Sequence, residues 1–259
     1  MKKVITLFTA LALLLALLAI GASAEENPVT VYVTVAVKGE LVAVQIPVVV
    51  NDYDNDGELT VNDALYGVHK QEYAGGADAG YACYSSDYGL SMSKLWGDES
   101  GAYGYYLNNA SCQSLADPVK DGDHVTAFVY ASADFGDVYT YFDVSSVTCE
   151  PDDKITLTLM AAGYDENWNP ITYPVEGATL TFNGREIGFV TDAEGKVTLS
   201  PEAAGKHVFS ATHGEMTIVP PVCTVTVNKP EKQGCKAVVG ASLIALVPLA
   251  FLCIKKRER

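Results

Sequence analysis

The stretch DYDNDGELTVND, residues 52–63, constrains this chain more than any other, because its oxygen-bearing residues have the spacing of a calcium-binding loop. The glycine at loop position 6, Gly57, permits the sharp turn that brings the next carbonyl toward the ion. The expected ligands are Asp52, Asp54, Asp56, the carbonyl of Glu58, Thr60 and Asp63. The sequence therefore predicts that Ca²⁺ binds between a strand and the helix that follows it.

The same residues also suit an acidic turn without metal, because Asp, Asn and Gly favour turns. Charge repulsion favours the metal, since two like charges about 4 Å apart repel by up to about 4 kcal/mol at a surface-like dielectric. The last ligand, Asp63, is shorter than the Glu of a standard EF-hand. With the strand-like IPVVV before it and one helix after it, the loop resembles the half EF-hand of dockerins. The sequence has no second copy of this repeat, so cohesin binding is not implied.

Both ends of the chain carry targeting patterns. Two lysines, an apolar run and a small-residue exit predict a secretory signal peptide over residues 1–24, with a retained membrane anchor as the alternative. Residues 237–254 contain no charge and precede a basic tail at 255–259, so they predict one transmembrane helix with a cytoplasmic tail. The remainder would be extracellular on a single-pass cell-membrane protein. These last residues also resemble bacterial surface sorting signals, although the sequence has no LPxTG motif.

The charge and the motif content exclude several classes of function. The formal net charge of −15 would repel nucleic acid and favour cations or basic partners. The four histidines are scattered along the chain, and neither HExxH nor GxSxG occurs. We therefore expect no enzyme activity. The partners that remain are the membrane and an extracellular protein or glycan.

The cysteine pattern agrees with export. Four cysteines lie in the predicted extracellular part, and the sequence favours the local pairing of Cys83 with Cys112 and of Cys149 with Cys223 among the three possible ones. The spacings lack CxxC pairs, which argues against zinc. Cys235 has no partner in this pairing, and it is either a free thiol or a processing or lipid-attachment site.

Residues 27–144 are predicted to form an α+β, β-grasp-like domain. Two valine-rich runs meet at Lys38-Gly39 as a hairpin, an apolar stripe at helical spacing follows the loop, and further strands turn at Asn108-Asn109. YGLSMSKLWG, GAYGYYLNN and DPVKDGDHVTAFVY are similar to the DUF4430 or transcobalamin-C-terminal-like domain of surface proteins of Gram-positive gut bacteria. That resemblance implies corrinoid binding only weakly, because the helical partner domain of transcobalamin is absent from this sequence.

An aromatic strand offers a candidate ligand face. Tyrosine and tryptophan rings give flat contact surfaces at low entropic cost. The candidates are Trp96, Tyr103, Tyr105 and Tyr106. The alternative is core and cross-strand packing, since strand alternation places Tyr103 and Tyr105 on one face and Tyr106 on the other.

Residues 145–228 read as short alternating strands between turns, typical of an all-β Ig-like sandwich. GATLTFNGREIGFVTDAEGKVTL resembles bacterial Ig-like and carboxypeptidase-regulatory-like surface repeats, and 229–236 would link the sandwich to the membrane. We expect a multidomain, membrane-anchored, calcium-binding adhesion module on an Ig-like stalk. A small-molecule, corrinoid-like receptor and an envelope structural protein without a specific ligand are the alternatives.

Overall fold

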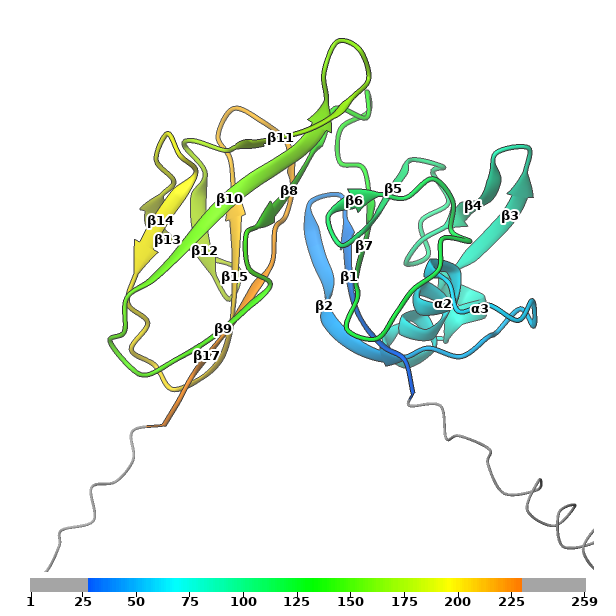
Figure 1. The fold of residues 1–259 in the computed structure, drawn as a ribbon, viewed down its shortest axis with the longest axis horizontal. Coiled ribbons are helices and arrows are strands. Elements are labelled where there is room, and N and C mark those ends of the chain that lie inside the picture. Colours follow the sequence, from blue (N-terminus) through cyan, green and yellow to red (C-terminus); the bar gives the residue numbers. More distant parts are fainter. Residues whose placement is uncertain (1–27, 230–259) are drawn as a thin grey trace, which may run out of the picture. The chain divides into compact units, whose positions relative to one another are not determined.

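The structure is a computed structural model that describes residues 28–229. The predicted signal peptide, membrane helix and basic tail lie outside these residues, as does Cys235. Within residues 28–229, no helix is long and apolar enough to cross a membrane. The described part is mainly β-structure, arranged as one mixed sheet with two helices and a small two-stranded sheet, followed by two further sheets (Figure 1).

The first sheet is five-stranded, in the order β2-β1-β7-β5-β6. Strand β1 pairs antiparallel with β2 and parallel with β7, which comes after both helices and four further strands in the chain. The bounds are β1 Thr30–Val37, β2 Glu40–Val49, β5 Tyr103–Leu107, β6 Ala110–Ser111 and β7 His124–Val129. Both hairpin turns were predicted. Lys38 and Gly39 have φ of 50° and 84°, and Asn108 and Asn109 have 50° and 66°, the pair of positive values that matches strand twist.

Helix α2, Val61–Glu72, packs its apolar stripe on this sheet. Leu65 and Val68 are fully buried in one core with alternate residues of β1 such as Val33. The predicted order of hairpin, helix and further strands is thus confirmed. The short helix α3, Ala77–Gly80, and a separate two-stranded sheet, β3 Ala82–Ser86 with β4 Gly89–Lys94, complete this part.

The remaining strands form a two-sheet sandwich, as predicted. One sheet has the order β11-β10-β8-β16, with β14 also on β10, and the other has the order β13-β12-β15-β17-β9. Their shared core takes alternate residues from both sheets, for example Leu157 and Leu159 from β10 and Val225 from β17. The bounds are β8 Val138–Phe142, β9 Ser146–Cys149, β10 Ile155–Tyr164, β11 Pro170–Pro174, β12 Thr179–Phe182, β13 Arg185–Val190, β14 Lys196–Leu199, β15 Gly205–Thr212, β16 Ile218–Val219 and β17 Cys223–Val227.

Strand β8 departs from the predicted division after Val144. It pairs antiparallel with β10 and parallel with β16, so a segment assigned to the first domain belongs to the sandwich. The correction has a simple cause, because an alternating aromatic strand fits either sheet and only its distant partners decide between them. The first domain therefore ends at about β7.

A bulge in β2 ties the first sheet to the sandwich. The register slips between Val33 and Val35, and Gln45 takes a left-handed φ of 44°, which re-aims its side chain. The Gln45 amide donates to the Ser145 carbonyl at 2.8 Å and accepts from the Thr224 hydroxyl at 2.9 Å. A small apolar cluster adds to this joint, with Ala36, Phe128, Tyr139 and Val219 at its centre.

Candidate functional site

The segment between β2 and α2 holds the predicted calcium loop. Thr60 caps the helix in a capping box with Asp63, and the next two backbone N–H groups donate to the carbonyls of Asp117 and Leu115 at 3.0 and 2.8 Å. The start of the helix is therefore fixed from two directions. This fixes Asp63, which lies in the first turn of α2.

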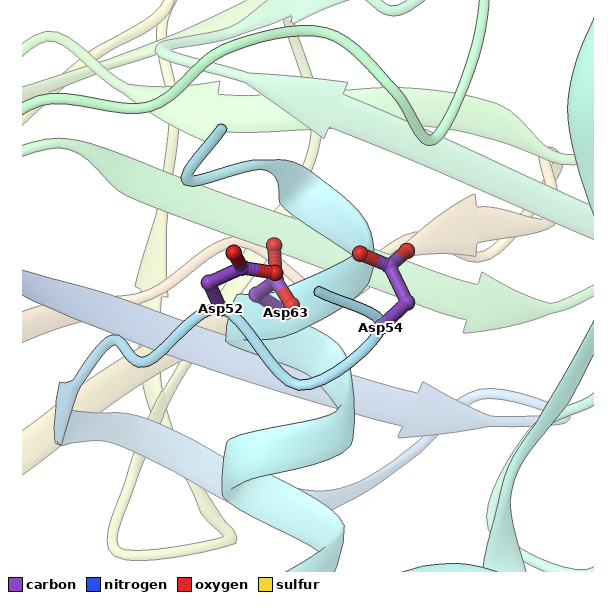
Figure 2. Close-up of side chains that lie close together, drawn as sticks. All are labelled: Asp52, Asp54 and Asp63. Carbon is purple, nitrogen blue, oxygen red and sulfur yellow. The ribbon is translucent and has the colours of Figure 1, made fainter. Parts of the chain in front are cut away.

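Three of the predicted ligands converge on one place. Figure 2 shows Asp52 and Asp54 from the loop and Asp63 from the helix. One carboxylate oxygen from each lies within 4.8 Å of the other two. Calcium binds oxygen at about 2.3–2.6 Å, so two ligands of one ion are separated by up to about 5 Å. The spacing of the three carboxylates thus fits contact with a single ion.

Backbone hydrogen bonds hold these carboxylates in position. Asp52 accepts from the N–H groups of Asp56 and Gly57 at 3.1 and 3.0 Å, which closes the loop over it. Asp63 accepts from the Tyr53 N–H at 2.8 Å and the Thr60 N–H at 3.0 Å. Gly57 has a φ of 92°, the left-handed value that its position requires. A carboxylate offers about four lone-pair sites, so these bonds leave room for a metal.

The electrostatics of the cluster favour a cation. The pKa of Asp54 is raised by partial burial and then by the charges of Asp63 and Asp56, which indicates uncompensated negative charge. Among residues 28–229, the two salt bridges are Lys38–Asp98 and Lys94–Glu99, and neither involves the loop. A divalent ion would neutralise a cluster that no basic side chain neutralises.

Two of the remaining predicted ligands make hydrogen bonds within the loop and the helix cap. Asp56 is exposed and accepts from the Glu58 N–H at 2.9 Å. The Thr60 hydroxyl is buried and donates to Asp63 at 2.8 Å as part of the cap. Asp56 does not join the group of three carboxylates. Coordination by the Glu58 carbonyl stays a prediction.

The sequence did not single out Asn62, although it stands beside the cluster. It is buried, and its amide donates to Asp54 at 3.0 Å and accepts from the Tyr81 hydroxyl at 2.8 Å. Asn62 therefore links the loop to the core. Its place immediately before Asp63, at a helix start, was the available signal.

The structure divides the predicted aromatic ligand face. Trp96, Tyr103 and Tyr105 pack against the first core, which is the packing alternative. Tyr106 points to the other face, as strand alternation predicted, and its ring stacks on Tyr139 with a centroid distance of 3.6 Å. Burial raises the pKa of Tyr106 to about 12. Tyr106 also borders a groove, together with Tyr164 and Trp168, two residues that the sequence did not single out.

The structure contains neither of the predicted disulfides. All four cysteines within residues 28–229 are free thiols. In the parallel pairing of β17 with β9, Cys149 lies opposite Val227 rather than Cys223. At about 3.3 Å per residue, that register separates the two cysteines by about 13 Å, well beyond disulfide reach. No local sequence pattern predicts this register.

Comparison with known proteins gives little further information. No protein-family model matches the chain, and no curated protein sequence matches it. Among solved structures, the D0-D1 domain of Intimin is similar over 58% of this chain and 80% of that chain, at 17% identity and a TM-score of 0.27. A TM-score this low shows neither a shared fold nor a shared function.

Proposed function

We propose that this chain is a membrane-anchored binding or adhesion protein of the cell surface, in which calcium stabilises the first domain and the Ig-like sandwich serves as a stalk. The observation that carries the calcium role is the convergence of three carboxylates within 4.8 Å, with no basic partner among the described residues. The surface location rests on the sequence of the two chain ends. The proposal includes no catalytic step.

Calcium in this proposal is structural. Asp52, Asp54 and Asp63 would hold it, and the ion would join the loop to the first turn of α2. Extracellular calcium modules bind with dissociation constants of about 0.1–1 mM, where external calcium fills the site. Each tenfold excess of calcium over the dissociation constant adds about 1.4 kcal/mol to the free energy of unfolding.

The resemblances to dockerin half EF-hands, to the DUF4430 or transcobalamin-C-terminal-like domain and to Gram-positive surface repeats agree with this proposal, and they rest on the motifs alone. A second candidate function is a receptor for a small molecule such as a corrinoid. The groove beside Tyr106 favours a binding function of some kind over an envelope structural protein without a ligand.

Thermal unfolding in calcium and in chelator tests the metal role. We expect calcium at ten times its dissociation constant to raise the melting temperature by about 3–6 °C, from about 2–4 °C per kcal/mol when residues 28–229 unfold as one unit. Asp54→Asn should remove most of this effect, whereas Asp87→Asn, an exposed carboxylate outside the cluster, should keep it. Equal melting temperatures with and without calcium would reject the proposal.

Capture experiments test the binding role. The chain, immobilised and exposed to mucin, host glycans and cell-wall fragments, should retain one class of ligand. The experiment runs in calcium and in chelator, which shows whether retention depends on the ion. Retention of none of these ligands would favour the structural alternative.

A further inference from the structure

A groove lies between the β5–β6 turn and the β10–β11 hairpin. Its volume is about 560 Å³, within the range of about 300–1,000 Å³ found for small-ligand sites. Tyr106, Asn109 and Gln113 line it from the first sheet, and Tyr164, Trp168 and Thr172 line it from the hairpin. It shares no residue with the carboxylate cluster.

Two aromatic rings of the hairpin are exposed in this groove. Trp168 is 81% exposed and Tyr164 is 51% exposed, and their ring centroids lie 6.1 Å apart. Large aromatic side chains are mostly buried in a folded protein, so two adjacent exposed rings need an explanation. Flat rings exposed beside polar groups are typical of recognition surfaces.

The hairpin turn holds Trp168 in an unfavourable backbone conformation. Its φ is 63°, a left-handed value that is rare for a bulky residue. The Asp165 carboxylate fixes the turn by accepting from the N–H groups of Asn167 and Asn169, both at 2.8 Å, and from the Asn169 amide at 2.9 Å. The Trp168 N–H donates to the Asp165 carbonyl at 3.0 Å. The turn therefore presents the indole to solvent at a conformational cost.

The charge and polarity of the groove narrow the ligand class. None of its lining residues is charged, although the chain has a net charge of −15. A site without charge offers nothing to pair with an ionic ligand. Asn109 accepts from the Tyr139 hydroxyl at 3.0 Å. Its amide nitrogen and the side chain of Gln113 make no hydrogen bond to any described residue, so both are available to a ligand.

We propose that this groove binds a neutral saccharide. A sugar ring has an apolar C–H face that would lie on Trp168 and Tyr164, and hydroxyl groups that would bond the amides of Asn109 and Gln113. A peptide strand fits less well, because the edge strand β11 begins and ends with proline, and proline blocks strand pairing. The inference rests on the proposed extracellular binding function but not on calcium.

Isothermal titration calorimetry of the full chain with lactose, cellobiose, chitobiose and N-acetyllactosamine tests the inference. The detergent must lack a sugar headgroup, which would compete for the site. We expect at least one of these sugars to bind, and Trp168→Ala to weaken that binding at least about tenfold, as loss of a stacking ring predicts. Asp165→Ala should weaken binding severalfold, because the turn would no longer hold the indole in place.

Tyr88→Ala is the matched control, since Tyr88 is 90% exposed and lies outside the groove. It should bind the sugar as the unaltered chain does, and sialyllactose, an anionic sugar, should bind more weakly than lactose. Binding should persist in chelator, and calcium-dependent melting is recorded on the same samples. If calcium raises the melting temperature but no neutral sugar binds through Trp168, only the groove inference is overturned. If sugar binds but calcium has no effect, only the metal role is overturned.

Discussion

Burial of His69 predicts that the first domain loses stability in mild acid. The side chain is 0% exposed on α2. Its Nδ1 donates to the Leu65 carbonyl at 2.7 Å, and its Nε2 accepts from the Trp96 N–H at 3.0 Å, so the bonding fits the neutral ring. The rings of Tyr73, Tyr81 and Trp96 surround it. A proton added at Nε2 would face another donor in an aromatic pocket.

The size of the effect follows from the pKa. Burial lowers the pKa of His69 to about 4, against about 6.5 in the unfolded chain. The unfolded chain therefore binds more protons between these two values, and stability is lost as the pH falls through this window. Linkage gives a loss of about 2 kcal/mol between pH 7.5 and pH 5, and about 3 kcal/mol when the titration is complete.

Urea unfolding in calcium-free buffer over this pH range measures the loss. Other groups titrate too, so the comparison is with His69→Gln and His69→Phe, which share only the loss of the titrating ring. Both variants should be less stable at pH 7.5, because each repacks a filled core. Both should also show a pH dependence that is smaller by about 2 kcal/mol. A pH dependence equal to that of the unaltered chain would refute the assignment of the effect to His69.

Four variants test other parts of the structure by urea unfolding. Gly104→Ala should lower the free energy of unfolding by about 1–3 kcal/mol, because a Cβ at this position would overlap the buried Phe128 ring. An unchanged free energy of unfolding would contradict this packing. Without calcium, Asp63→Asn should lower the free energy of unfolding by about 1–3 kcal/mol, because the helix cap is lost. Asp54→Asn should not lower it, because this substitution relieves charge repulsion. Equal effects of the two substitutions would contradict these separate roles. Gln45→Ala should lower the free energy of unfolding by about 1–3 kcal/mol, since it leaves the buried Thr224 hydroxyl and the half-buried Ser145 carbonyl unpaired, and a neutral result would show that the joint is weak.

Local chemistry made much of the fold predictable. Lys38-Gly39 and Asn108-Asn109 are turn pairs whose conformational preference is intrinsic, and the spacing of Leu65 and Val68 marks a buried helix face. Strand β8 was misassigned because its partners, β10 and β16, lie far along the chain. The same limit applies to the cysteines, since no local pattern sets the register between β9 and β17.

The candidate metal site was predictable for a similar reason, because Asp52, Asp54 and Asp63 follow a spacing imposed by one short loop. The helix cap formed by Thr60 could also be predicted, because Asp63 follows it by three residues, which is the spacing of a capping box. The groove was not predictable, because Tyr106 and Trp168 line the same groove only when two separate sheets pack together. The tryptophan inside the hydrophilic turn DENWNP indicates an exposed aromatic residue, but it does not indicate where a groove would form.

The last described strand, β17, has a mechanical consequence. It runs parallel to β9 and antiparallel to β15, and it is the last described strand before the proposed membrane anchor in the sequence. Drag on a tethered protein would pull β17 along its own axis, so its hydrogen bonds to both neighbours would share the load in shear and would not open one after another. A sandwich with this strand arrangement would resist unfolding under flow better than one whose final strand could be peeled from a sheet edge.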